Sequence, residues 1–191
     1  MKKLFTVLIL SIIGICAFAQ TKMPTGLLNI EFGETQENAE SKMINRGFTL
    51  ISKLDKDKIE FSGKFSGRDS TIILEFYEDQ FCCAFVLYEP DLNKTIDTFD
   101  KIVSDFKKVY GEPNIKKREF KYPYEEGDGH EETAIALNKT DIYCFWSFSN
   151  DNRIMVSIGY SKEPFIGVVY VNNPLYEKAK GEEEATNLSD L

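Results

Sequence analysis

Histidine is almost absent from this chain, and the common catalytic motifs are missing altogether. His130 is the only histidine in 191 residues, so a site that needs two imidazoles cannot form. The sequence has no glycine-rich phosphate loop, no zinc-site spacing and no serine nucleophile elbow. His130 lies in an acidic segment without an evident nucleophile or orienting partner. We therefore predict no catalytic residue, no metal ligand set and no cofactor.

Positive charge is also scarce. The chain has 23 Lys and Arg against 31 Asp and Glu, which gives a formal net charge of −8. Nucleic-acid binding depends on clustered Lys and Arg, so this composition argues against a nucleic-acid partner. Beyond the first twenty residues there is no long apolar run, and we predict no transmembrane segment. The hydrophobic content of 42% is typical of a globular chain.

Residues 1–19 have the pattern of a secretory signal peptide. Lys2 and Lys3 precede an apolar stretch over 4–15, and Ala17-Phe18-Ala19 fits the small-x-small cleavage pattern. A lipoprotein signal would use Cys16, but the preceding Ile15 is not small, so the pattern does not favour a lipid anchor. We expect an exported protein, periplasmic or extracellular, whose mature chain begins at Gln20.

Three cysteines remain after this cleavage. An oxidising compartment permits one disulfide, joining Cys144 to either Cys82 or Cys83. Cys82 and Cys83 are adjacent in a predicted strand, so their side chains point to opposite faces. The other interpretation is three small buried side chains, which is the usual state of a free cysteine. The sequence leaves both interpretations open.

The pattern along the mature chain is helix, strands, helix, strands. Thr35 is a plausible N-cap for a short helix that ends at Gly47, and a strongly amphipathic helix ends at Gly111. Alternating apolar residues predict antiparallel strands after each helix. We predict an α+β fold with two helix-plus-antiparallel-meander units, 20–90 and 91–176, whose helices pack on one face of the sheet. The acidic segment 177–191 is predicted to lack regular structure.

Two short segments carry a family resemblance. Ile30-Glu31-Phe32-Gly33-Glu34-Thr35, followed by Ala39, Met43 and Gly47-Phe48, resembles the opening of units in the β-lactamase-inhibitor-protein-like class. Val109-Tyr110-Gly111-Glu112-Pro113 resembles the helix ending in that class, whose fold the small lipoprotein of the outer-membrane β-barrel assembly machine shares. The resemblance implies an exported, non-catalytic protein that acts by binding another protein.

The strand face that points away from the helices is rich in residue types common at protein interfaces. If Ile72, Leu74 and Phe76 face the helices, the opposite positions are Ile73, Tyr77, Val86, Tyr88, Tyr143, Phe145 and Met155. In a single-layered sheet these side chains form an open surface. The alternative is that the second helix, the tail or the N-terminal segment covers them. The candidate interface residues are Tyr77, Tyr88, Tyr143, Phe145 and Met155.

The segment 125–132 carries five acidic residues on a glycine-bearing loop. Hard cations bind to such oxygen-rich loops, but acidic runs are also typical of solvated hairpin tips. We therefore predict a protein-binding module, an envelope accessory factor or an inhibitor. The alternatives are a small-ligand or cation-binding module and a carboxylate-based hydrolase.

Overall fold

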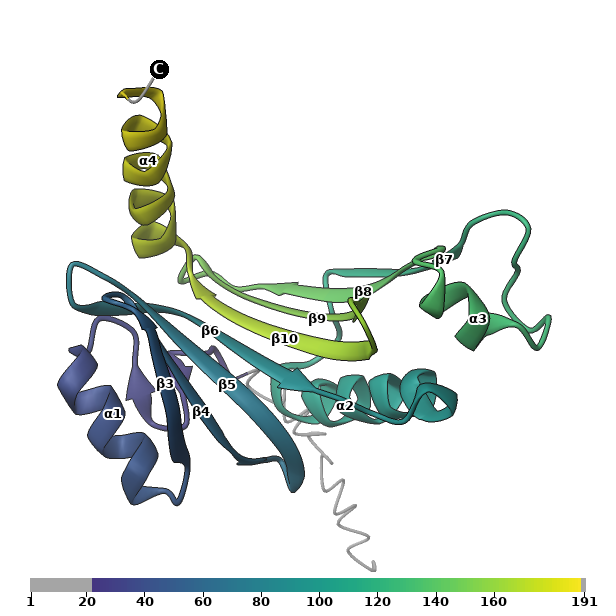
Figure 1. The fold of residues 1–191 in the computed structure, drawn as a ribbon, viewed down its shortest axis with the longest axis horizontal. Coiled ribbons are helices and arrows are strands. Elements are labelled where there is room, and N and C mark those ends of the chain that lie inside the picture. The colour runs from purple at the N-terminus through teal and green to yellow at the C-terminus, as the bar shows by residue number, and fades with distance from the viewer. Residues whose placement is uncertain (1–21, 190–191) are drawn as a thin grey trace, which may run out of the picture.

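The computed structural model describes residues 22–189, so the predicted signal peptide lies outside the described residues. Eight strands form one antiparallel sheet in the order β3-β4-β5-β6-β10-β9-β8-β7 (Figure 1). They are β3 (Thr49–Asp55), β4 (Lys58–Phe65), β5 (Arg68–Tyr77), β6 (Gln80–Tyr88), β7 (Ile115–Phe120), β8 (Thr140–Ser147), β9 (Asn152–Tyr160) and β10 (Pro164–Asn172). A separate two-stranded sheet pairs β1 (Gly26–Leu27) with β2 (Ile30–Glu31).

The helices are α1 (Gln36–Asn45), α2 (Thr95–Tyr110), α3 (Glu131–Ala136) and α4 (Asn173–Ser189), with a short 3-10 turn, η1 (Leu92–Lys94), before α2. The α+β prediction is confirmed. At the start of α1, the Thr35 hydroxyl accepts a hydrogen bond from the Asn38 backbone N–H at 3.4 Å. Gly47 and Gly111 follow α1 and α2 with φ of 85° and 79°, which glycine adopts without the steric cost of a Cβ. Among the described residues, no helix is both long and apolar enough to cross a bilayer.

One hydrophobic core contains side chains from both halves of the sheet, β3 to β6 and β7 to β10, and from α1 and α2. Phe106 of α2 packs against Trp146 of β8 and Tyr170 of β10, with ring centroids 5.9 and 6.1 Å apart. The Trp146 indole N–H donates to the Gly111 carbonyl at 2.9 Å, which ties β8 to the end of α2. Burial of each large side chain contributes about 1.5–3 kcal/mol, so these contacts fix α2 on the sheet.

The N-terminal segment of the described chain lies on the core side of the molecule. The Pro24 carbonyl accepts hydrogen bonds from the side-chain amides of Asn152 at 2.7 Å and Asn150 at 3.2 Å. Leu27 and Ile30 are buried in the core. This segment therefore covers the core rather than the opposite face of the sheet.

Helices α3 and α4 occupy segments in which the sequence pattern did not indicate a helix. The alternation of Ile135 and Leu137 is typical of a strand, but the structure has helix α3 there, with Ala134 and Ile135 buried. The acidic segment 177–191 was predicted without regular structure, but 177–189 belong to α4. The Asn172 side chain accepts from the Leu175 N–H at 3.1 Å at the start of α4, and Lys, Glu and Ala favour helix.

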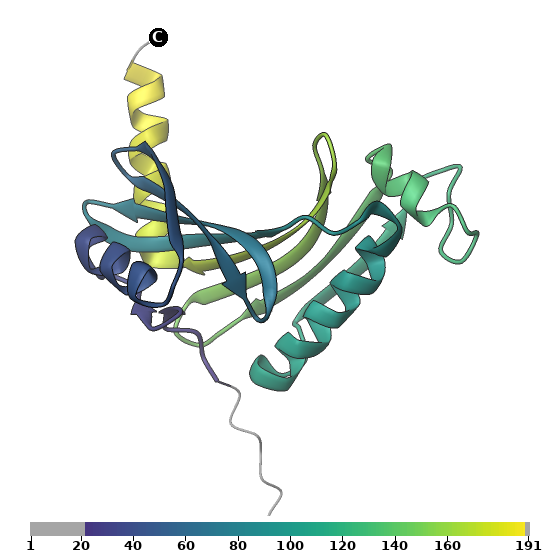
Figure 2. The same cartoon turned by 60° about the horizontal axis from the view of Figure 1, so that its bottom comes forward.

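Helix α4 packs against β5, β6 and β10 through its first turns, where Leu175, Tyr176 and Ala179 are half-buried. Figures 1 and 2 show α4 rising from the side of the sheet opposite to α2. Within residues 22–189, the two faces of the sheet therefore have different neighbours: the core on one side, and α4 at one end of the other.

Candidate functional site

The strand positions that alternate with the core residues form a second face of the sheet, which we call the open face. Its centre is a row of six apolar side chains that are register partners on six neighbouring strands: Ile73, Phe85, Val169, Met155, Phe145 and Ile115. All six are at least partly exposed, with Met155 at 37% and Ile115 at 49%. We call these six residues the apolar row.

A more polar row runs beside the apolar row in the next register. Its members are Thr49, Ser62, Thr71, Leu87, Gly167, Ser157, Tyr143 and Lys117. Beyond Gly167, the Phe165 ring lies over Gly159, where an added Cβ would come within 2.3 Å of the ring. The open face thus combines an apolar centre with hydroxyl groups along one side.

On its other side the apolar row is bounded by α4. The next register there contains Glu75, Cys83, Val171, Arg153 and Ser147. Cys83 is fully buried although it belongs to the open face, because α4 packs on this part of β5, β6 and β10. Helix α4 therefore covers the part of the open face on this side of the apolar row and leaves the apolar row itself accessible.

The structure places the candidate interface residues in three different settings. Tyr143, Phe145 and Met155 lie together on the open face, on β8 and β9. Tyr77 is half-buried at the end of β5. Tyr88 is wrong as an interface residue, because it is only 3% exposed and belongs to the core, where burial raises its pKa. Val86 is likewise a core residue.

The error at Tyr88 has a simple cause. Residues of β6 are apolar at nearly every position, so alternation of polar and apolar residues could not show which of them face the core. The register does show it, because Ile72 and Val86 are partners within the core. For the same reason the sequence missed Phe85, Leu87 and Val169, which are on the open face.

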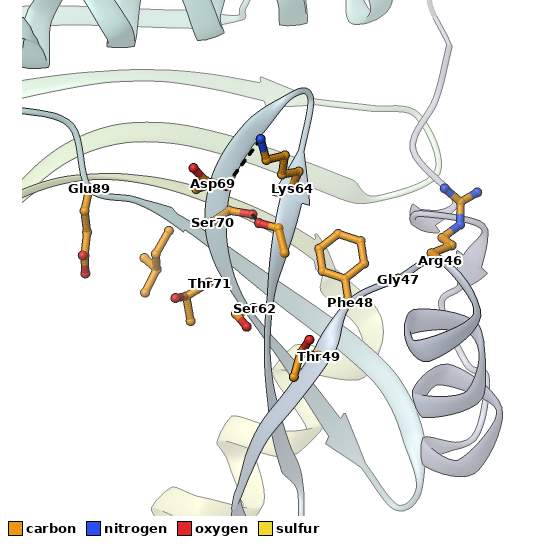
Figure 3. A pocket seen from close by; sticks show the side chains of 12 residues that line it. Arg46, Gly47, Phe48, Thr49, Ser62, Lys64, Asp69, Ser70, Thr71 and Glu89 are labelled. Atoms are coloured by element: carbon orange, nitrogen blue, oxygen red, sulfur yellow. Dashed lines mark hydrogen bonds and ion pairs between the residues drawn. The ribbon is translucent and has the colours of Figure 1, made fainter.

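A pocket of about 710 Å³ lies where the polar row reaches β3, β4 and β5 (Figure 3). Thr49, Ser62 and Thr71 contribute hydroxyl groups to its lining. The Lys64 ammonium and the Asp69 carboxylate, also in the lining, are 3.9 Å apart. The lining has charges of both signs, and the Ser70 hydroxyl, which also belongs to it, donates to the Gly63 carbonyl at 3.1 Å.

The acidic loop uses its carboxylates to order its own backbone. Asp128 accepts hydrogen bonds from the backbone N–H groups of Glu125 at 2.9 Å and His130 at 2.7 Å, and both lower the pKa of Asp128. Glu131 accepts from the Gly127 N–H at 2.8 Å. Within residues 22–189, no three His, Cys, Asp or Glu side chains are grouped as a metal would need.

Glu132 of α3 binds the first turn of α2. Its carboxylate lies at the backbone of Thr95 and Ile96, and one of its oxygens, Oε2, is buried without a partner among the described residues. Burial raises the pKa of Glu132, and the polar groups of Thr95 and Ile96 oppose this effect. Negative charge is favourable at a helix N-terminus, so Glu132 joins the loop to α2.

The three described cysteines are free, so the predicted bond from Cys144 to Cys82 or Cys83 is absent. Strands β9 and β10 separate β8 from β6. Three interstrand spacings of about 4.8 Å place β8 and β6 about 14 Å apart, and Cys144 is in register with Val86 rather than with either cysteine of β6. A disulfide needs Cα atoms within about 7 Å. The other interpretation, three buried thiols, agrees with their burial.

Comparison of this chain with protein-family models, with curated proteins and with solved structures gave no match.

Proposed function

We propose that this chain is an exported, non-catalytic protein-binding module, an envelope accessory factor or an inhibitor, and that the open face is its contact surface. The apolar row carries this proposal. It brings six large apolar side chains into register across six strands and leaves them partly exposed. Contiguous exposed apolar surface is typical of interaction sites, and aromatic residues and Met are enriched in them.

We also propose that the chain consists of two related helix-plus-meander units, as in the β-lactamase-inhibitor-protein-like class that its helix boundaries resemble. Helix α1 precedes strands β3 to β6, and α2 precedes strands β7 to β10. The last strand of each group, β6 or β10, lies at the middle of the sheet, where the two pair. The buried side chains of α1 and α2 belong to one core, which supports packing of both helices on the face opposite to the open face.

Photo-crosslinking in the native envelope tests the proposed contact surface. A benzoylphenylalanine replaces Met155 in the tagged full chain, and a control carries it at Ile51 on β3, which is 51% exposed but outside the apolar row. We expect a discrete crosslinked species from position 155 and none from position 51. The species should disappear when Tyr143 and Phe145 are both replaced by Ser, because both side chains flank Met155 on this face.

The double variant must keep the wild-type circular dichroism spectrum and melting temperature. If it unfolds, Tyr143 and Phe145 support the fold, and the single variants Tyr143→Ser and Phe145→Ser replace it in the comparison. Absence of a crosslink from position 155 at native abundance, or equal crosslinking from positions 155 and 51, would contradict the proposal.

A further inference from the structure

We propose that Arg153 anchors the partner on the open face, and that the partner segment presents a carboxylate to it between large apolar side chains. This inference rests on the proposed function and specifies the chemistry of the partner. Arg153 is exposed on β9, two residues from Met155, so both side chains project from the same face beside each other. Its register partners are Val171 and Ser147.

Arg153 differs from the other charged side chains on the open face in and beside the apolar row, because each of those already has a partner. Glu60 accepts from the Ser52 hydroxyl at 2.9 Å, and Glu75 pairs with Lys58 at 3.1 Å. Lys117 pairs with Asp141 and with Glu119.

The guanidinium of Arg153 forms no ion pair or hydrogen bond with any residue of 22–181, the range whose side chains the structure describes. While it is in water this lack of a partner has little cost. A protein that covers Met155 and Val171 would remove that water, and an unpaired buried charge is strongly unfavourable.

A carboxylate satisfies this requirement best. The guanidinium has five donors in a planar fork, which a carboxylate accepts in a bidentate geometry. Arg is also one of the residue types most often found at the energetic centre of interfaces. The apolar row spans five interstrand spacings, about 24 Å, which is the length of about 16 helical residues. A partner segment therefore has room for apolar side chains along the row and an acidic residue at Arg153.

Selection from a displayed library of random segments, each about 16 residues long, tests this inference while the partner itself is unidentified. The library is panned on the mature chain, and the enriched segments are then measured against the Arg153→Gln variant. We expect the enriched segments to share an Asp or Glu flanked by Leu, Phe or Met. Their affinity should fall about 10-fold or more in Arg153→Gln, because the carboxylate loses its charged partner. Lys108→Gln is the control and should leave affinity unchanged, since Lys108 lies on α2, on the other side of the sheet from the open face, and is paired with Asp105 at 2.9 Å.

The outcomes separate this inference from the proposed function. Segments without an acidic residue, or with equal affinity for Arg153→Gln, would overturn the role of Arg153. Loss of their binding in the Tyr143→Ser, Phe145→Ser variant would still support the open face as the contact surface. If no segment is enriched, a short carboxylate-bearing segment is not the partner, and crosslinking from position 155 decides separately whether a protein binds there. Arg153→Gln must melt like the wild type for these comparisons to hold.

Discussion

The three buried thiols give the clearest prediction for single residues. Burial raises the pKa of Cys82 to about 12 from 9.0, and the charge of Glu75 adds to the effect. A rise of about three pKa units leaves about a thousandfold less thiolate at neutral pH, and the thiolate is the reactive form. We expect the native mature protein to react negligibly with Ellman's reagent and the unfolded protein to titrate three thiols. Rapid reaction of one native thiol would contradict this burial.

Glu132 makes stability depend on pH in an unusual direction. Its pKa is raised above the ordinary value of 4.5 by burial, so the folded state holds the proton more tightly than the unfolded chain does. The contribution of Glu132 to stability therefore falls as pH rises through and above 4.5. In Glu132→Gln we expect the change in melting temperature from about pH 4 to about pH 7 to be more positive than in the wild type. Glu125→Gln, at an exposed position, is the control, and equal pH dependence of all three proteins would refute the effect.

Sequence reasoning at the scale of residues worked where the signal is local. Thr35 was predicted as an N-cap and accepts the expected type of hydrogen bond. Whether Tyr88 faces the core is not a local property, because β6 is apolar on both faces and only its pairing with β5 decides the question. Arg153 carried no signal in the sequence, since its lack of a partner depends on which charges the sheet brings near it.

Helix α2 is the element whose contribution to stability can be tested most directly. Phe106 is buried against Trp146 and Tyr170, whereas Val109 on the same helix is 46% exposed. Phe106→Ala should lower the free energy of unfolding by about 3–5 kcal/mol, because a cavity remains in the core. Val109→Ala should cost about 0.5 kcal/mol or less, as is usual for surface changes. Urea unfolding followed by circular dichroism measures both, and similar losses in the two variants would be inconsistent with this packing.

The four α-helices of residues 22–189 show which elements a sequence reveals. The apolar side chains of α2 recur at helical spacing, and Gly111 and Pro113 stop the helix, so its extent was predictable. Helix α3 has six residues, which are too few to distinguish the helical period from strand alternation. Its position depends on the contact of Glu132 with the first turn of α2, which is far away in the sequence. Helix α4 has the acidic composition typical of a segment without regular structure, but its Glu, Ala and Lys residues also have high helix propensity.

At the scale of the whole molecule, the α+β class followed from the sequence but the strand order did not. Consecutive strands with short turns predict antiparallel neighbours, which accounts for most of the sheet. The pairing of β6 with β10 has no local signal, because both strands are apolar on each face. The open face was predicted at Tyr143, Phe145 and Met155, where alternation is clear. Its full extent depends on that central pairing, which brings Phe85 next to Val169.

This pairing also determines when the molecule can fold. Val168 pairs with Val86, which precedes it by 82 residues, so the middle of the sheet is made from the last strand to be synthesised. Until β10 pairs with them, β6 and β9 are both unpaired edge strands, and unpaired apolar edge strands tend to pair with other chains and aggregate. Contacts between such distant positions slow folding because a long loop must close first. We therefore expect a chain truncated before Pro164 to aggregate rather than to fold into half of the molecule. A chaperone that covers the free edge of β6 should be needed until β10 is available to pair with it.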